Sequence, residues 1–518
     1  MEQIPDRPSP ACLEPLQPLR RYVPLAVWVI VLMTLLIIPL RIIQYGYVPT
    51  DDALRSAAKA VSGKSWQQIL VLNDIYKIDH EYGWSLLLSK IHTFFNANAD
   101  NILIFSVVSM FLLIGFVVVF WLRYPEAWLL GLALSMISAL LPCRFMLGRP
   151  FLVTMAALMI ILFLWRHFGF AKPKTWMIAL MTLAIAASVY FHGTWYLWGL
   201  PIAAFFLAGQ WRWGFTLVGC WIAGVVLGCL LTGHPIEYPV QAIKVLELAT
   251  GKHITQRTLV SEMQPANGDV NALYILGGLL LLRRLAPIKA VPFVRDPVFW
   301  LVAMSWVLAF KVGRFWVDWG WPSLLVMVVW DLQSLLESRV IADSFQRLVV
   351  VCGAALLAFL SITSDVGSRW TYNLTEQYLT ADNPDLAGWM PDKGGILYST
   401  DMTVFYQTFY KNPTADWKYI LGFESTLMRP EDFDVYHSVL WNFGDSKAYT
   451  PWLLKMKPAD RLVVRGGRSS PPNIPQLEWN YGISGTWVGR LPDHQGGVPP
   501  TVPASKPMSS LTNSVSGK

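Results

Sequence analysis

Two adjacent acids, Asp51 and Asp52, follow directly after an apolar segment over residues 22–43. Neighbouring carboxylates repel each other when both are ionised, so one tends to stay charged while the pKa of the other is raised. Such a pair suits a general base that removes a proton from a hydroxyl group. Thr50 and both acids are also good capping residues, so capping of a helix that starts near Ala53 is the alternative.

A second group of reactive side chains lies in the same loop, where Asp79, His80 and Glu81 are consecutive. Consecutive side chains on a regular element point in different directions, so shared metal ligation would require a turn. The other interpretations are a loop that contacts a sugar and ordinary structural hydrogen bonding. His192, farther along the chain, is flanked by aromatic residues and is either structural or in contact with a substrate.

Four cations occupy two short polar segments between apolar runs: Arg144 and Arg149 in the first, Lys311 and Arg314 in the second. Guanidinium groups bind phosphate oxygens through paired hydrogen bonds, so these residues predict a site for a phosphate-bearing head group. The alternatives are snorkelling to lipid phosphates and pairing with Asp318.

The composition is that of a polytopic membrane protein: 54% of the 518 residues are hydrophobic, only 14% are charged, and 25 are tryptophan. The net charge of +7 comes from the part before residue 364, because residues 364–518 carry 14 Lys and Arg against 15 Asp and Glu. This charge fits contact with the anionic lipids of the bilayer, and no nucleic-acid-binding motif is present. The five cysteines show no paired spacing, so we expect neither a disulfide framework nor a zinc site.

Apolar runs long enough to cross the membrane predict about eleven helices, centred near residues 33, 112, 135, 158, 183, 203, 223, 277, 305, 327 and 355. Lys and Arg gather in alternate short loops, which the positive-inside rule places in the cytoplasm together with the N-terminus. The plasma membrane, with the acidic pair, the four cations and the C-terminal region on the periplasmic or extracellular side, is therefore the expected location. The loops with this positive charge hold Arg20, Arg21, Arg123, Arg166, Lys172, Lys174, Arg212, Arg283, Arg284, Lys289, Arg295, Arg339 and Arg347.

The first external loop, residues 44–101, has apolar residues at helical spacing from Ala53 to Leu72, with a break at Gly63. We expect this segment to lie along the membrane surface, followed by a second amphipathic helix over Tyr82–Phe95. In the later loop 233–270, His234 and Glu237 have no fixed role, and the polar residues 251–269 could order over a substrate.

The chain resembles the GT-C superfamily of integral membrane glycosyltransferases, in its bacterial branches that use polyprenyl-phosphate sugars. The similar phrases are Pro49–Arg55, Gly148–Pro150, Phe191–Trp195 and Gly313–Gly320. The resemblance extends in architecture over roughly residues 20–365 and is specific in sequence only around the acidic pair.

The resemblance implies a polytopic α-helical fold and a polyprenyl-phosphate-linked sugar donor, with inversion at the anomeric carbon. It implies that Asp51 or Asp52 is the base on the acceptor hydroxyl, where the acceptor is a glycan, a lipid or a protein. Some members use a divalent metal and others do not, and this sequence has no clear ligand set. Candidate substrate-binding residues are Arg55, Asp79, His80, Glu81, Arg144, Arg149, His192, Lys311, Arg314 and Asp318.

Composition changes near residue 364, where a small α/β domain over residues 364–490 is expected on the external side. Strands are predicted over Gly394–Thr400 and Arg461–Arg465, with a helix or a strand over Met402–Tyr410. The remaining parts are a cytoplasmic tail over residues 1–21, the transmembrane module over residues 22–363, and a disordered tail over residues 491–518.

The sequence therefore predicts an inverting glycosyltransferase that works at the external membrane face. A transporter or flippase of a lipid-linked phosphate would use the same cations without chemistry. Transporters often carry mid-membrane charges or internal repeats, and this sequence shows neither. An integral enzyme of another kind, such as a phospho-group transferase or a polysaccharide polymerase, is a further alternative.

Overall fold

The computed structural model describes residues 19–49, 52–138, 140–169, 171–249, 263–266, 268–286, 288, 291–342, 344–374, 376–466, 470–483 and 485–492. Asp51, Lys289 and most of the polar segment 251–269 lie outside the described residues. So do residues 1–18 and 493–518, which include nearly all of both predicted tails.

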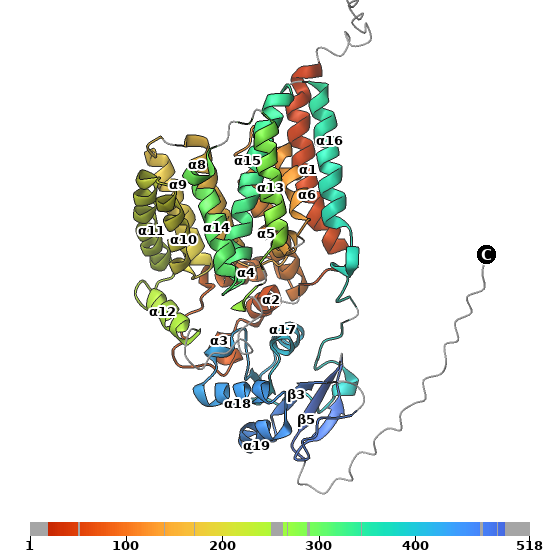
Figure 1. Ribbon diagram of the computed structural model, residues 1–518. Coiled ribbons are helices and arrows are strands. Elements are labelled where there is room, and N and C mark those ends of the chain that lie inside the picture. Colours follow the sequence, from red (N-terminus) through yellow and green to blue (C-terminus); the bar gives the residue numbers. More distant parts are fainter. Residues whose placement is uncertain are drawn as a thin grey trace, which may run out of the picture.

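The long helices form a bundle, and a sheet with its own helices lies beyond one end of it (Figure 1). Each of the eleven predicted centres falls within a helix of this bundle. The bundle comprises α1 (Val23–Gln44), α5 (Ala99–Val119), α6 (Glu126–Ser135), α8 (Phe151–Phe168), α9 (Thr175–Phe191), α10 (Gly199–Leu207), α11 (Trp211–Leu231), α13 (Val270–Leu285), α14 (Pro297–Ala309), α15 (Trp321–Arg339) and α16 (Phe345–Thr363).

Among the described residues, five helices are long and apolar enough to cross a membrane: Leu19–Gln44, Ala99–Val119, Phe151–Phe168, Trp211–Leu231 and Phe345–Thr363. Four shorter apolar helices accompany them: Glu126–Ser135, Thr175–Phe191, Trp195–Leu207 and Pro297–Ala309. These helices indicate a membrane protein. The count of eleven spans stays a prediction.

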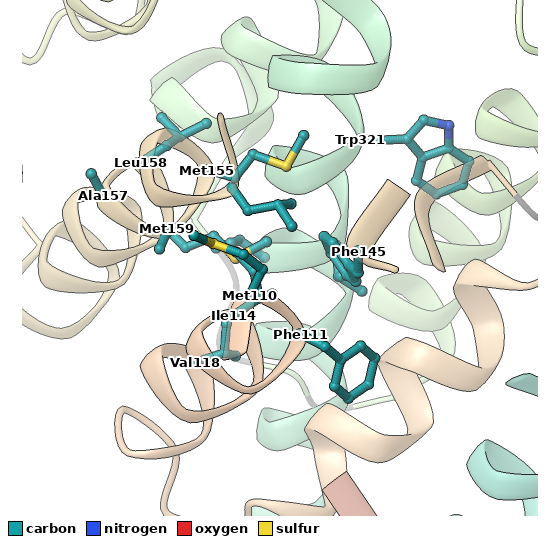
Figure 2. Close-up of a cluster of buried hydrophobic side chains, with 14 of the residues drawn as sticks. Met110, Phe111, Ile114, Val118, Phe145, Met155, Ala157, Leu158, Met159 and Trp321 are labelled. Carbon is teal, nitrogen blue, oxygen red and sulfur yellow. The ribbon is translucent and has the colours of Figure 1, made fainter. Parts of the chain in front are cut away.

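Close packing holds the bundle together, because lipid tails are as apolar as the helix surfaces and burial alone gives no preference for helix contact. Figure 2 shows Met110, Ile114 and Val118 of α5 beside Met155 and Met159 of α8, and all five side chains are buried. Helix α11 meets α9 through small residues. A Cβ atom added at Gly228 would lie 2.7 Å from the Cβ of Val189.

Short elements cover the end of the bundle that faces the sheet. They are α2 (Asp52–Ser62), α3 (Trp66–Ile69), α4 (Tyr82–Phe95), α7 (Leu140–Phe145), the 3₁₀ turn η2 (Trp195–Trp198), α12 (Glu237–Ala249) and the π-helix η5 (Trp316–Gly320). Helix α2 begins with an acid in its first turn, which the helix dipole favours, and it ends before Gly63, whose φ is +63°. The predicted break at Gly63 and the predicted helix Tyr82–Phe95 are both confirmed.

The C-terminal sheet has five strands in the order β2-β1-β3-β5-β4. Strands β2, β1 and β3 are parallel, and β5 and β4 are antiparallel to their neighbours. The predicted strands at residues 394–400 and 461–465 are confirmed, and Met402–Lys411 is a helix whose first turn is capped by Asp401. The elements are β1 (Ile396–Ser399), α17 (Met402–Lys411), β2 (Lys418–Tyr419), α18 (Pro430–Trp441), α19 (Thr450–Lys455), β3 (Arg461–Arg465), β4 (Glu478–Tyr481) and β5 (Thr486–Arg490).

The two faces of this sheet pack against different partners, because successive strand residues point in opposite directions. Leu397 and Val463 belong to a buried cluster with α17 and the first loop, whereas Tyr398 and Leu462 face α18 and α19. The first loop also extends the edge of the sheet, since the N–H of Val71 donates to the carbonyl of Tyr419 at 2.9 Å. The first loop and the C-terminal sheet are therefore packed as one unit.

Paired charges stabilise the opposite end of the bundle. Helix α8 has 18 residues and is therefore about 27 Å long, so its last turn lies far from the site end of the bundle. In its last turn Arg166 donates to Asp296 at 2.5 Å. At this end Arg283 also pairs with Asp331, and Arg347 pairs with Glu126, each at 2.7 Å. Three arginines that the positive-inside rule counts as loop charges are thus in ion pairs.

We expect the substitution Gly228→Val to lower the free energy of unfolding by about 1–3 kcal/mol, because the new side chain would overlap Val189. Gly219→Val on the same helix is the matched control, since nothing lies within 4 Å of a Cβ atom there. Thermal unfolding in detergent measures the difference. Equal Tm values for the two variants would show that α9 and α11 do not meet as described.

Candidate functional site

Asp52 lies where the first loop, the bundle and the C-terminal region meet. Its Oδ1 accepts a hydrogen bond from Nε of Arg55 at 2.9 Å, and its Oδ2 lies 3.5 Å from Nε of Arg149. The hydroxyl of Tyr406, on α17, donates to Oδ1 at 3.3 Å. One carboxylate therefore joins three segments that are far apart in the sequence.

Arg55 is buried between two carboxylates. Its Nη2 donates to Oε1 of Glu81 at 2.8 Å, while its Nε bonds to Asp52. Burial raises the pKa of Glu81, but Arg55 and His80 together lower it by more, so the net pKa is below its ordinary value. The Arg55 guanidinium also lies 4.1 Å from the ring centre of Phe423, which is a cation–π contact.

The carboxylate of Asp79 accepts a hydrogen bond from the backbone N–H of Glu81 at 3.0 Å, but its side-chain partners differ from those of Glu81. Its carboxylate accepts hydrogen bonds from Lys59 and from the hydroxyl of Ser85, the latter at 2.6 Å. Burial raises its pKa, but Lys59, His80 and Ser85 together lower it by more, so the net pKa is below its ordinary value. Of the alternatives for this loop, structural hydrogen bonding is observed for Asp79.

Asp318 joins two of the four predicted phosphate-binding cations. Arg144 Nη2 donates to its Oδ1 at 2.7 Å, and Arg314 Nε donates to its Oδ2 at 2.8 Å. Asp318 lies on the π-helix η5, a rare geometry that often marks functional sites. The alternative of pairing with Asp318 is therefore observed. Lys311 is exposed, and within the described part of the chain no contact joins its side chain to these residues.

His192 follows the last residue of α9 and faces a small cavity. Its ring centre lies 5.8 Å from that of His80 and 5.1 Å from that of Phe151. Burial lowers its pKa well below 6.5, and Arg314 lowers it further, so the imidazole is neutral at neutral pH. The cavity has a volume of about 130 Å³, and His80, His192, Arg314, Phe423 and Glu424 are among its lining residues.

A larger cavity, of about 930 Å³, lies on the other side of segment 76–80. Gln241 of α12 separates the two spaces, because its side-chain amide bonds to the backbone of Lys77 and Ile78. None of the arginines described above lines the larger space. The smaller cavity is therefore the one that reaches these arginines, through Arg314.

Seven residues make up what we call the arginine–carboxylate site: Asp52, Arg55, Glu81, Arg144, Arg149, Arg314 and Asp318. All seven were predicted from the sequence, whereas Asp51, the other predicted catalytic acid, lies outside the described residues. Sequence reasoning missed Tyr406 and Glu424, which the C-terminal region contributes. The only signal for Glu424 is an acid directly after the apolar run Ile420–Phe423, where a short strand has just ended.

His80, Glu81 and His192 can place three ligand atoms within 4.8 Å of one another. Imidazole nitrogens and carboxylate oxygens are ligand types that zinc accepts. The electrostatics oppose a divalent cation. Glu81 is the single acid of this trio, and its Oε1 already accepts from Arg55 at 2.8 Å. The positive charges of Arg314 and Arg149 also lower the pKa of His192, and they would repel a cation bound beside it. The three residues therefore do not fit a metal centre.

A metal that binds the folded protein would raise its stability by mass action. Because the trio does not fit a metal, we expect the Tm of the purified protein to be unchanged by EDTA, by Mn²⁺ and by Zn²⁺ at about 1 mM. Differential scanning fluorimetry measures this. A metal-dependent rise in Tm that disappears in His192→Asn would show that the trio does bind a cation.

The neutral state of His192 predicts a pH effect on stability. The unfolded chain takes up a proton near pH 6.5 whereas the folded protein does not, so the free energy of unfolding falls as the pH drops below that value. We expect the Tm of the wild type to fall more between about pH 7.5 and about pH 5.5 than that of His192→Asn. Equal decreases would indicate that His192 is protonated in the folded state.

Comparisons with known proteins show little. No protein-family model matches the chain, and no curated protein sequence matches it. Among solved structures, the oligosaccharyltransferase of Archaeoglobus fulgidus in its apo form is similar at 10% sequence identity, with a TM-score of 0.47. The match covers 88% of this chain and 70% of that one. This likeness is too weak to establish a family, so the function proposed next depends on the site itself.

Proposed function

We propose that the protein is an inverting glycosyltransferase that moves a sugar from a polyprenyl-phosphate-linked donor to the hydroxyl group of an acceptor. The observation that carries this proposal is the arginine–carboxylate site, which brings Asp52 and Arg149 within 3.5 Å at one end of an apolar helical bundle. Guanidinium groups suit a departing phosphate, and carboxylates suit the proton of an attacking hydroxyl. The acceptor is a glycan, a lipid or a protein.

The leaving group of this reaction is a lipid phosphate, which gains negative charge as its bond to the anomeric carbon breaks. Arg149 and Arg314 are the candidates to stabilise that charge. Their resting partners, Asp52 and Asp318, keep both guanidinium groups oriented before substrate arrives. Because the phosphate is already a good leaving group, no second carboxylic acid is needed to protonate it, unlike in glycoside hydrolases.

The attacking group is the acceptor hydroxyl, which must lose its proton as it bonds to the anomeric carbon. A single displacement of this kind inverts the configuration of that carbon. The family resemblance implies that Asp51 or Asp52 removes the proton, and the contacts of Asp52 are consistent with a place beside the reacting atoms.

The placement in the membrane supports a lipid-linked donor. Phe94 and Phe95, at the end of α4, are 81% and 70% exposed, as expected for residues that enter the bilayer surface. The lipid chain would then lie among the apolar helices while its phosphate reaches the arginines. The distribution of Lys and Arg in the loops favours the periplasmic or extracellular side for this reaction, with the N-terminus in the cytoplasm.

We expect the purified protein in liposomes to transfer labelled sugar from at least one member of a panel of polyprenyl-phosphate sugars. Asp52→Asn should lower turnover by about 100-fold or more, because the variant removes a candidate base and the carboxylate that Arg55 and Arg149 share. Asp51→Asn is measured beside it. Asp434→Asn, at an exposed acid of α18, is the matched control and should keep full activity.

Folded yield and Tm are compared for all four proteins before turnover is measured. Donor binding without turnover in any of them, unchanged by Asp51→Asn or Asp52→Asn, would favour a transporter or flippase of the lipid-linked phosphate. Transfer that is equally fast in Asp52→Asn and in Asp434→Asn would place the reaction elsewhere in the molecule.

A further inference from the structure

Glu424 belongs to the C-terminal region and yet lines the small cavity beside the arginine–carboxylate site. It follows Phe423, whose ring covers the guanidinium of Arg55 at 4.1 Å, and it precedes the short 3₁₀ turn Ser425–Leu427. The strand β2 ends at Tyr419, so this segment leaves the sheet and points a loop toward the bundle.

Glu424 differs from the other carboxylates of the site in its hydrogen bonding. Asp52, Glu81 and Asp318 each accept hydrogen bonds from a guanidinium group. Within the described part of the chain, the carboxyl group of Glu424 forms no hydrogen bond and no ion pair. A hydroxyl group that enters the cavity can therefore reach its oxygens without displacing an arginine.

The surroundings of Glu424 also make it a better proton acceptor than a solvent-exposed carboxylate. Burial raises its pKa above the ordinary 4.5 and Asp52 adds to this, whereas Arg314, His80 and Arg55 act against it. A base removes a proton more effectively when its pKa lies closer to the working pH. The titratable groups that face it are Arg314, His80, Asp52 and Arg55, Tyr406 of α17, Tyr196 of η2 and Tyr436 of α18.

We propose that Glu424 is the catalytic residue that takes the proton of the acceptor hydroxyl, and that Asp52 instead positions Arg55 and Arg149. This inference rests on the proposed glycosyl transfer and reassigns its base. The acceptor oxygen bonds to the anomeric carbon, its proton moves to the Glu424 carboxylate, and the bond from that carbon to the lipid phosphate breaks. The electron pair of the broken bond stays on the phosphate, beside Arg149 and Arg314.

The consequence is a site divided between two parts of the chain. The helix α2 supplies the carboxylate that holds the arginines, and the C-terminal region supplies the base. Contacts between the two parts keep them in register: Tyr406 donates to Asp52 at 3.3 Å, and Lys64 pairs with Asp416 at 3.1 Å. Without the C-terminal region, the donor could still bind, but the acceptor would lack its proton acceptor.

The test uses the full-length protein in liposomes with the polyprenyl-phosphate sugar that the wild type turns over. We expect Glu424→Gln to lower kcat by about 100-fold or more while donor KM and donor binding change by less than about threefold. Glu424→Asp should keep part of the activity. Glu431→Gln, at an exposed acid of α18, is the matched control with the same chemical change.

The pH dependence separates a base from a structural residue. The wild-type kcat should rise with pH as Glu424 loses its proton, with a midpoint above pH 4.5, and the slow turnover of Glu424→Gln should lack this rise. Asp52→Asn should turn over slowly, but its kcat should still rise with pH as in the wild type.

Three results would overturn the assignment while leaving glycosyl transfer intact: Glu424→Gln within threefold of the wild type, a change in acceptor KM alone, or an unchanged pH profile. If the wild type and Glu431→Gln both transfer no sugar from any donor of the panel, the proposed function itself fails and the assignment fails with it. Tm values of the variants show whether a loss reflects misfolding.

Discussion

The buried guanidinium of Arg55 is the group on which the architecture of the site depends. A buried charge is costly unless it is paired and hydrogen-bonded, and Arg55 meets this requirement through Asp52 at 2.9 Å and Glu81 at 2.8 Å. Its face is covered by Phe423 of the C-terminal region. One side chain therefore fixes the start of α2, the loop before α4 and the segment that carries Glu424.

The two ends of the bundle use the same residue types in different ways. At the end far from α2, Arg347 and Glu126 form a pair with Nε and Oε1 2.7 Å apart, and both side chains are almost fully buried. At the other end, Arg314 pairs with Asp318 but also lines a cavity, and its side chain is 18% exposed. The closed pairs are sealed within the bundle, whereas the pair that borders the cavity is the one to which the proposed function assigns the phosphate.

The helices and strands could be predicted because their signals are local. The apolar runs, the glycine at position 63 and the short apolar run Leu462–Val464 are each read within a single element. The residues of the arginine–carboxylate site could also be found, because paired acids and arginines at the ends of apolar runs are rare without a reason. The pairing of Arg144 with Asp318 could not be chosen over phosphate binding, since both follow from the same side chains.

The sequence by itself determined the membrane class, the positions of the bundle helices, two of the five strands of the C-terminal sheet and most of the charged side chains at the site. The tertiary structure alone decided which of them meet. Tyr406 reaches Asp52 across 354 residues, and Arg55 reaches Glu81 across 26. Glu424 enters the cavity only because the first loop and β2 pack together. Periodicity records which face of an element is buried, but it carries no information about the partner from another part of the chain.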